Sequence, residues 1–290
     1  MEHVDVILPT HRRPDTIGYS IQAILQQTHP HLELHVVGDG CDDATEAVVR
    51  SIDDRRVRFH RFPKGMGLGY ANRNHVLRGT TAAYVAYAAD DDLWLPDHLE
   101  RGLVALREHA LSFVAFRECP VLYPDTLDPH FFAFDWQLGP LSALLRNWFL
   151  GAGSGVHRRT VFDEVGYWNE QLARFGDREF YYRVRTSGLR WAYHDEVHML
   201  RFYAQHWDRH YPTLVEPPQR RYLSKTRDPE WVAFVRRSTA RGRRSIAVRR
   251  RQWAAFLRFG SRSGPKLLRL WYQQLRSSGA KPVRQSQGLA

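Results

Sequence analysis

Short apolar runs and amphipathic stretches alternate along the first ninety residues. The apolar runs are rich in Val, Ile, Leu and Tyr and cover residues 4–10, 32–40, 57–62 and 82–89. Between them, stretches with helical spacing of apolar residues cover residues 16–27, 42–52 and 70–79. Repeated strand-then-helix units of this length predict an α/β fold, with a mostly parallel sheet covered by helices on both faces.

Polar side chains gather where these predicted strands end. The clusters cover residues 10–13, residues 38–43 around Asp39, and residues 90–92. Parallel strands bring their carboxyl ends to one edge of the sheet, and ligands of such sheets bind there. We therefore expect the three clusters to line one binding site.

The second half of the chain is less regular. Residues 117–150 are rich in Pro, Phe and Trp without a single period, which favours a loop with short helices over a cleft. Order returns over residues 151–199, including an aromatic, acid-bearing helix at about 177–186. From about residue 225 the chain is rich in Arg, with apolar residues at helical spacing. We expect one domain over residues 1–225 and a basic helical extension over residues 226–290.

The net charge of +11 belongs to the C-terminal part of the chain. Residues 236–290 hold 15 of the 42 Lys and Arg and no Asp or Glu, which leaves residues 1–235 with a net charge of −4. A slightly acidic body with a basic tail favours a tail that meets an anionic surface, such as a membrane. The alternative is a nucleic-acid-binding protein, because Trp and Tyr between the basic residues of the tail can stack on bases. That alternative leaves the acids of the body unexplained.

Neither secretion nor membrane spanning is expected from the sequence. The N-terminus lacks a basic segment followed by a long apolar core, and no stretch reaches about 18 uninterrupted apolar residues. The two cysteines, Cys41 and Cys119, are too few for a disulfide scaffold and match no spaced zinc cluster. We expect a cytoplasmic protein, with the tail in peripheral contact with the inner face of the membrane.

The acid run, Asp90, Asp91 and Asp92, is the strongest chemical signal in the sequence. It directly follows the apolar residues 82–89. Three adjacent carboxylates at the end of a buried strand repel one another unless a cation or polar ligand lies there. Mg²⁺ and Mn²⁺ prefer oxygen ligands and bridge carboxylates to phosphates, so the acid run favours a nucleotide diphosphate site. The structural alternative is a solvated turn or a helix N-cap before residues 93–100.

Six motifs, in order, resemble those of the family 2 glycosyltransferases of the GT-A fold. Within residues 3–205 they are VILPTHRRP, VVGDGCDDAT, the helix with Arg73 and Asn74, DDDLWLPDHL, HRRTVFDEVGYWNEQL and FGDREFYYRV. The resemblance implies a Rossmann-like GT-A fold and an inverting transfer of a sugar from a nucleotide-sugar donor to a hydroxyl acceptor. It implies a saccharide or a lipid-linked glycan as that acceptor, and a divalent metal, Mg²⁺ or Mn²⁺, as the cofactor.

The resemblance also assigns donor-binding roles to individual residues. Thr10, Arg13 and Asp39 match positions that hold the base and the ribose of the nucleotide. Arg73 and Asn74 match a pair near the diphosphate, where a guanidinium offsets phosphate charge.

The metal position of the family falls on Asp91, with Asp92 as a second ligand. The usual Asp-x-Asp-Asp of the family appears here as Ala89, Asp90, Asp91 and Asp92, so the first acid is missing. We expect Asp90 to compensate for it in binding the nucleotide-sugar.

The resemblance places the catalytic base at Asp177. The Glu-Asp pair of the family precedes an aromatic helix and appears here as Gly176 and Asp177. The base must lie within hydrogen-bond reach of the acceptor hydroxyl, which we expect to enter over residues 117–160. Glu179 is the rival base, and ion pairing of both acids at a helix N-terminus is the structural alternative. A nucleotidyltransferase, the related enzyme class, needs a glycine-rich phosphate loop after the first strand, and residues 11–14 lack it. A further alternative is an inactive sugar-nucleotide-binding body whose Arg-rich tail binds nucleic acid.

Overall fold

The computed structural model describes residues 2–122, 126–127, 151–202, 208, 211 and 213–242, all within one compact unit that ends at Gly242. Its strands are β1 (Val4–Thr10), β2 (Leu32–Asp39), β3 (Val57–Phe62), β4 (Tyr84–Tyr87), β5 (Leu93–Trp94), β6 (Phe113–Leu122), β7 (Thr126–Leu127), β8 (Gly155–Arg158) and β9 (Trp191–Arg201). Its helices are α1 (Ile17–Leu25), α2 (Asp43–Arg50), α3 (Tyr70–Gly79), α4 (His98–Glu108), α6 (Thr160–Val165), α7 (Gly176–Thr186), α9 (Pro218–Thr226) and α10 (Pro229–Gly242), with a 3₁₀ turn at Ala152–Ser154. Most of the predicted basic extension, residues 243–290, lies outside the described residues.

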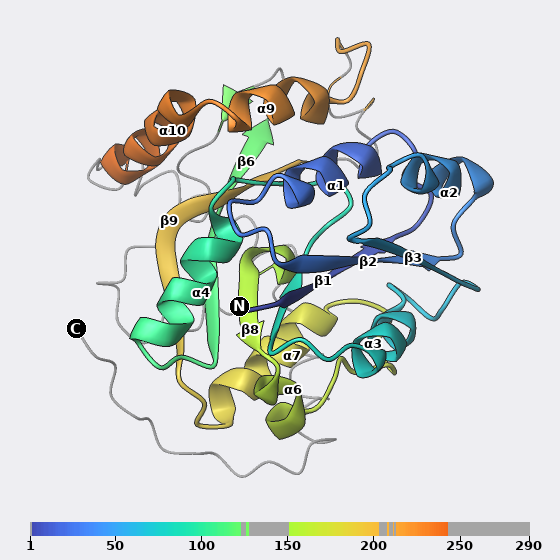
Figure 1. Ribbon diagram of the computed structural model, residues 1–290, viewed down its shortest axis with the longest axis vertical. Helices are drawn as coiled ribbons and strands as arrows, with labels where there is room; N and C mark the ends of the chain where they lie inside the picture. Colours follow the sequence, from blue (N-terminus) through green and yellow to red (C-terminus); the bar gives the residue numbers. More distant parts are fainter. Residues whose placement is uncertain are drawn as a thin grey trace, which may run out of the picture. The chain divides into compact units, whose positions relative to one another are not determined.

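The N-terminal half of the chain builds the parallel part of the sheet, in the order β3-β2-β1-β4 (Figure 1). In β1, Val4 lies opposite Leu32 and Thr10 lies opposite Gly38. Both faces of β1 are buried, which explains why its residues are mostly apolar on both faces, with Asp5 and Thr10 as buried polar exceptions. The carboxyl ends of β1, β2 and β4 therefore meet at one edge of the sheet.

The rest of the sheet is mixed. Strand β4 pairs antiparallel with β8, β8 pairs antiparallel with β6, β6 runs parallel to β9, and β9 pairs antiparallel with β5. The predicted α/β fold with a helix-flanked sheet is confirmed, and its parallel part is the half that the sequence pattern shows. The antiparallel strands β5 and β8 have two and four residues, too short to give a periodic signal.

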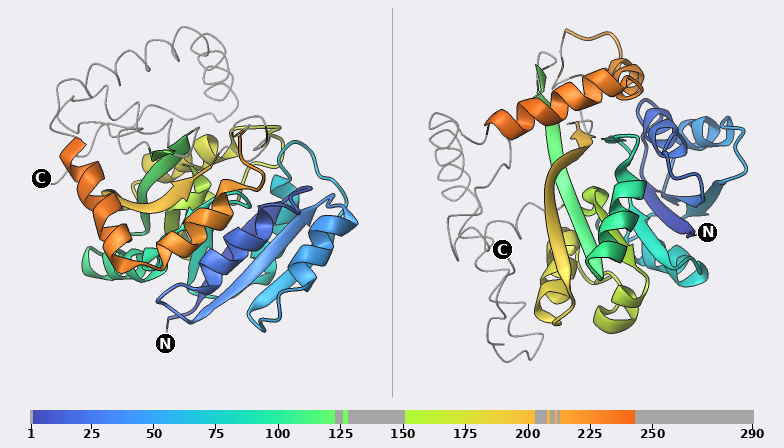
Figure 2. Two further views of the ribbon diagram at one scale, coloured as in Figure 1. Left: turned by 90° about the horizontal axis from the view of Figure 1, so that it is seen from above. Right: turned by 60° about the vertical axis from the view of Figure 1, so that its left-hand side comes forward.

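Helices cover both faces of the sheet (Figures 1 and 2). On one face, Ile21 of α1 and Leu103 of α4 belong to the same apolar cluster as Val6 of β1. On the other face, Leu77 of α3 packs in a cluster with Ile7 of β1, together with residues of α6 and α7. Neighbouring residues of β1 thus pack against helices on opposite faces of the sheet, because successive side chains of a strand point to opposite faces.

The helices α9 and α10 close the far end of the sheet. Leu223 of α9 and Val235 of α10 share an apolar cluster with Leu200 of β9, and Figure 1 shows both helices beside the end of β6. Arg236 of α10 also donates to both carboxylate oxygens of Asp97, at 2.6 and 3.0 Å. The first half of α10, up to Arg236, therefore packs on the body, and the domain boundary near residue 225 stays a prediction. Among the described residues, no helix is long and apolar enough to cross a membrane.

Strand β6 corrects one part of the sequence analysis. Residues 117–122 form the second half of β6 and not the start of a loop. A proline usually ends a strand because it lacks a donor, but Pro120 is aligned with Arg201 in the parallel pair with β9. The register shifts between Phe116 and Glu118, and such a bulge changes the pairing before the proline.

Candidate active site

A pocket of about 540 Å³ opens at the carboxyl ends of β1, β2 and β4. Its size lies within the usual range for small-molecule sites. The predicted site residues that line it are Thr10, Arg13, Asp39, Arg73, Asp90, Asp91 and Asp92. The three polar clusters at the strand ends therefore share one cavity, while Asn74 and Asp177 lie outside its lining.

Side chains from α1 and α9 bind the backbone of the acid run. The carbonyl oxygens of its first, second and third residues accept hydrogen bonds from Thr16 Oγ1, Gln219 Nε2 and Ser20 Oγ, each at 2.9 Å. Gln219 is fully buried and Ser20 nearly so, so these donors are fixed within the fold. The acid run is therefore held in place by its backbone, which leaves its carboxylates to face the pocket.

The carboxylates of the acid run lack enough nearby positive charge to balance them. Burial raises the pKa of Asp91 to about 7, and the charge of Asp90 adds to this rise. Burial also raises the pKa of Asp92 well above its usual range, with the Asp91 charge adding to it. Arg13, with Nε 3.8 Å from Asp90 Oδ1, opposes the rise at Asp90 without cancelling it. Clustered oxygen ligands with raised pKa values fit a hard divalent cation.

Asp39 holds the loop that lines one side of the pocket. Its buried carboxylate accepts from Lys64 Nζ at 2.6 Å, from the Gly65 backbone N–H at 2.7 Å and from Asn72 Nδ2 at 2.7 Å. Lys64 also donates to the carbonyls of Gly65 and Gly67. Asp39 thus orders residues 64–69.

Arg73 lines the pocket with a half-buried side chain. Its Nη2 donates to the Leu68 carbonyl at 2.7 Å, and its Cζ lies 5.0 Å from the centre of the Tyr70 ring. Burial lowers its pKa, while the charges of Asp177 and Asp39 act to raise it. The position suits a cation that neutralises an anionic ligand in the pocket.

Asn74, the neighbour of Arg73, instead forms hydrogen bonds with the loop before α7. It is fully buried, donates to the Trp168 carbonyl and to Glu170 at 2.8 Å each, and accepts from the Trp168 N–H. The structure therefore separates the two residues of the predicted Arg-Asn pair, and Asn74 supports the wall next to α7.

Asp177 lies in the first turn of α7. The helix starts close to α3, because the Gly176 N–H donates to Tyr70 Oη at 2.8 Å and a Cβ at Gly176 would lie 2.5 Å from the Tyr70 ring. Burial raises the pKa of Asp177, against the lowering effect of its bond from the Arg178 N–H. Its charge acts to raise the pKa of Arg73, which lines the pocket, so the two groups are coupled electrostatically although Asp177 is not part of the lining.

Glu179, the rival base, is engaged elsewhere. Its two oxygens accept from Arg183 at 2.7 and 2.9 Å. Arg183 in turn donates to the backbone carbonyls of Val165 and Tyr167. Glu179 therefore joins α7 to the loop after α6.

Glu118 is a site residue that the sequence analysis missed. It lines the pocket from β6, is 6% exposed, and pairs with Arg201 Nη1 at 3.2 Å. Burial raises its pKa, and the charge of Asp177 adds to the rise. A Cβ at Gly151 would lie 2.5 Å from its Oε1, so a larger residue at this position would require the Glu118 side chain to shift. The local signal for Glu118 is an acid within the apolar run of β6, but residues 117–150 were expected to form a loop.

Comparison with known proteins identifies a family that matches the part of the chain containing most of the residues that line this pocket. The family described as Glycosyl transferase family 2 matches residues 5–166. Protein CgeD of Bacillus subtilis is 30% identical over 202 residues, covering 64% of this chain and 46% of that protein. The UDP-Glc:alpha-D-GlcNAc-diphosphoundecaprenol beta-1,3-glucosyltransferase WfgD of Escherichia coli is 28% identical over 113 residues, covering 38% of this chain and 44% of that protein. The chain thus spans less than half of either relative.

Solved structures share the fold at low sequence identity. TarS residues 1–349 of S. aureus, in complex with UDP-GlcNAc, matches with a TM-score of 0.59 at 17% identity, over 73% of this chain and 61% of that chain. The mannosyltransferase PcManGT of Pyrobaculum calidifontis, in complex with GDP-Man and Mn²⁺, matches with a TM-score of 0.53 at 18% identity, over 93% of this chain and 82% of that chain. Both likenesses support the predicted GT-A arrangement of sheet and helices.

Proposed function

The chain belongs to glycosyl transferase family 2, and on this basis we propose that it transfers a sugar from a nucleotide-sugar donor to a hydroxyl acceptor with inversion. One observation carries the proposal: the acid run, Asp39 and Arg73 line one pocket, and the charge of Asp177 acts on Arg73. Such a pocket offers oxygen ligands for a cation, a guanidinium for phosphate and a carboxylate for a proton.

A divalent cation, Mg²⁺ or Mn²⁺, fits the acid run. The donor set is all oxygen, and the pKa values of Asp91 and Asp92, raised by burial and by the neighbouring Asp charges, support this proposal because a bound cation would stabilise the ionised carboxylates. We propose Asp91 as the main ligand with Asp92 assisting, and Asp90 beside the donor. When bound, the cation supplies positive charge that stabilises the leaving diphosphate.

The remaining donor contacts follow from the two ends of the pocket. We propose that Thr10, Arg13 and the loop held by Asp39 receive the base and ribose, because they lie beyond the acid run at the ends of β1 and β2. Arg73 adds charge compensation for the diphosphate, and Asn74 acts indirectly by fixing the loop at Trp168. At the other end, Glu118 accepts hydrogen bonds from hydroxyls of the transferred sugar, and Arg201, which pairs with Glu118, donates to their oxygens.

Asp177 is the proposed general base. It takes the proton of the acceptor hydroxyl as the oxygen attacks the sugar carbon and the nucleotide diphosphate leaves from the opposite side. Its raised pKa suits this role, because a base works best with a pKa nearer the operating pH. A saccharide or lipid-linked glycan is the proposed acceptor, and the acceptor in the name of the WfgD relative supports this class.

A donor screen by calorimetry tests the proposal. UDP-, GDP- and dTDP-sugars are titrated into the full-length protein with Mn²⁺ and again with EDTA. We expect one nucleotide class to bind only with the metal, and Asp91→Asn to abolish that binding. Equal affinity in EDTA overturns the metal role, and no binding of any nucleotide-sugar overturns the function.

A further inference from the structure

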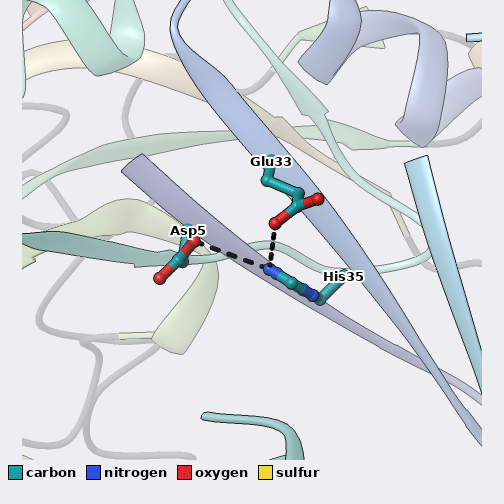
Figure 3. A group of neighbouring side chains, drawn as sticks. All are labelled: Asp5, Glu33 and His35. Atoms are coloured by element: carbon teal, nitrogen blue, oxygen red, sulfur yellow. Dashed lines mark ion pairs between the residues drawn. The ribbon is translucent and has the colours of Figure 1, made fainter. Parts of the chain in front are cut away.

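Three side chains converge at the amino ends of β1 and β2, at the opposite ends of these strands from the pocket (Figure 3). Asp5 and Glu33 are aligned across the two strands, and His35 follows two residues after Glu33 on the same face. His35 Nε2 lies 3.5 Å from Asp5 Oδ1 and 3.5 Å from Glu33 Oε2. All three ligand atoms lie within 4.8 Å of one another.

The His35 ring points a buried nitrogen into this group without a hydrogen bond. His35 is 6% exposed, and its Nε2 has no hydrogen-bond partner among the described residues. The other ring nitrogen, Nδ1, contacts His60 Nε2 at 3.1 Å, which fixes the ring orientation. A separation of 3.5 Å is long for a hydrogen bond. It is close to the spacing of about 3.4 Å between neighbouring ligands of a tetrahedral cation with bonds of about 2.1 Å.

Both carboxylates are held from behind by arginines. Asp5 Oδ2 accepts from Arg159 Nη2 at 2.8 Å, and Glu33 Oε1 accepts from Arg58 Nε at 2.7 Å. Each carboxylate therefore directs its second oxygen at His35 Nε2. Groups that bind the outer side of a ligand orient it in known metal sites. The two guanidiniums also repel a cation, so we expect an affinity in the micromolar range.

We propose that Asp5, Glu33 and His35 bind a divalent transition cation such as Zn²⁺. One imidazole nitrogen and two carboxylate oxygens are an ordinary ligand set for this ion. The Glu33 side chain is 32% exposed, which gives a path from solvent and room for water as a further ligand. The ion ties β1 to β2 and, through Asp5 and Arg159, to the start of α6. This site is independent of the proposed transfer reaction.

Zinc titration of the metal-free full-length protein, followed by calorimetry without nucleotide, tests the site. We expect a micromolar Zn²⁺ site whose affinity falls at least tenfold in His35→Asn and in Glu33→Gln. Co²⁺ bound in place of Zn²⁺ should give visible d–d absorption that both variants lose. The controls are Asp91→Asn, which removes the proposed nucleotide-site ligand, and His75→Asn, which removes an exposed histidine of α3. Both should keep the site.

Two outcomes overturn the proposal. One is the absence of Zn²⁺ and Co²⁺ binding in the wild-type protein, which would leave His35 as a member of an ion-pair network only. The other is equal affinity in wild type, His35→Asn and Glu33→Gln, which would place the metal elsewhere. If His35→Asn fails to fold, as judged by circular dichroism, the partly exposed Glu33→Gln decides the question.

Discussion

At the scale of single residues, two acids of helix α7 have different surroundings although they lie two positions apart. The charge of Asp177 acts on Arg73 of the pocket lining, whereas both oxygens of Glu179 are bound by Arg183. The sequence motif favours Asp177 as the general base. The ion pair of Glu179 with Arg183 gives the physical reason to reject Glu179, because its carboxylate is already bound. A matched pair of substitutions therefore separates the two.

We expect Asp177→Asn to lower turnover by about 10² to 10⁴, the usual contribution of a positioned general base. Donor affinity should change little, because Asp177 lies outside the pocket lining. Glu179→Gln should keep turnover within a few fold and mainly lower the melting temperature. Steady-state kinetics and donor calorimetry on both variants measure this, and near wild-type turnover in Asp177→Asn contradicts the assignment.

The raised pKa of Asp91 predicts a pH-dependent stability of the metal-free protein. A carboxyl whose pKa is raised in the folded state binds its proton more tightly there, so stability is full below about pH 4 and falls as pH rises through about 7. In EDTA, the melting temperature of Asp91→Asn should therefore exceed that of wild type by more at pH 8 than at pH 5. Equal differences at both pH values, measured by thermal melts, would contradict the pKa shift.

Single residues were predictable where they stand at strand ends, and not where tertiary packing brings them in. Thr10, Asp39 and the acid run follow apolar strands directly, so the rule for parallel sheets finds them. Lys64 and Glu118 reach the same pocket from a loop and from a strand of the mixed half. The acid inside the apolar run of β6 is a local signal for Glu118, but its place in the pocket depends on the pairing of distant strands, which no local pattern gives.

At the scale of elements, the loop of residues 64–69 depends on Asp39 for its form. Gly69 has φ +70°, and a Cβ there would lie 2.4 Å from the Asp39 carboxylate. This glycine therefore allows both the left-handed turn and the close approach. Asp39 lies 25 residues before Lys64, so the local sequence does not indicate that Asp39 orders this loop.

Gly69→Ala should destabilise this loop, with a backbone cost of about 1–2 kcal/mol for the left-handed conformation plus the clash with Asp39. We expect nucleotide affinity to fall at least tenfold, because the loop lines the pocket. Gly79→Ala is the control, since a Cβ at the end of α3 meets nothing within 4 Å. Unchanged affinity in Gly69→Ala, measured by calorimetry, would show that the loop does not contact the nucleotide.

Elements of the parallel half were predicted almost to the residue, and those of the mixed half were not. The sequence pattern predicted β1 at residues 4–10 and β3 at residues 57–62, as observed. For β6, Pro120 and the polar residues before it hid a strand that is buried along nearly its whole length. Its pairing with β9, more than seventy residues later, compensates for weak local preference.

At the scale of the whole molecule, helix α10 tests where the folded body ends. Val232 and Val235 are 8% and 1% exposed, and burying two such side chains contributes on the order of 3–6 kcal/mol. A chain ending at residue 242 should melt close to the full-length protein, whereas one ending at residue 225 should lose several kcal/mol. Urea unfolding of both truncations measures this, and equal stability would support the boundary at 225.

We propose that the basic residues 243–290 bring the protein to an anionic membrane surface near a lipid-linked acceptor. We expect the full-length protein to sediment with vesicles rich in phosphatidylglycerol, and less so at high salt, because the attraction is electrostatic. The chain ending at residue 242 should stay in the supernatant. Equal sedimentation of the two chains would contradict the proposal, and a nucleic-acid shift that needs the tail would favour the alternative.

The bonds to the backbone of the acid run have a consequence for the order of assembly during synthesis. Thr16 and Ser20 precede the acid run, but Gln219 leaves the ribosome about 130 residues after it. A nascent chain can pair β1 to β4 early, while the run still lacks its bond from Gln219 and the Phe202 N–H that binds Asp92. The three carboxylates, which repel one another, then lack part of the hydrogen bonding that fixes their positions. A partly synthesised chain therefore has the parallel half of the sheet before it has a site able to bind a nucleotide.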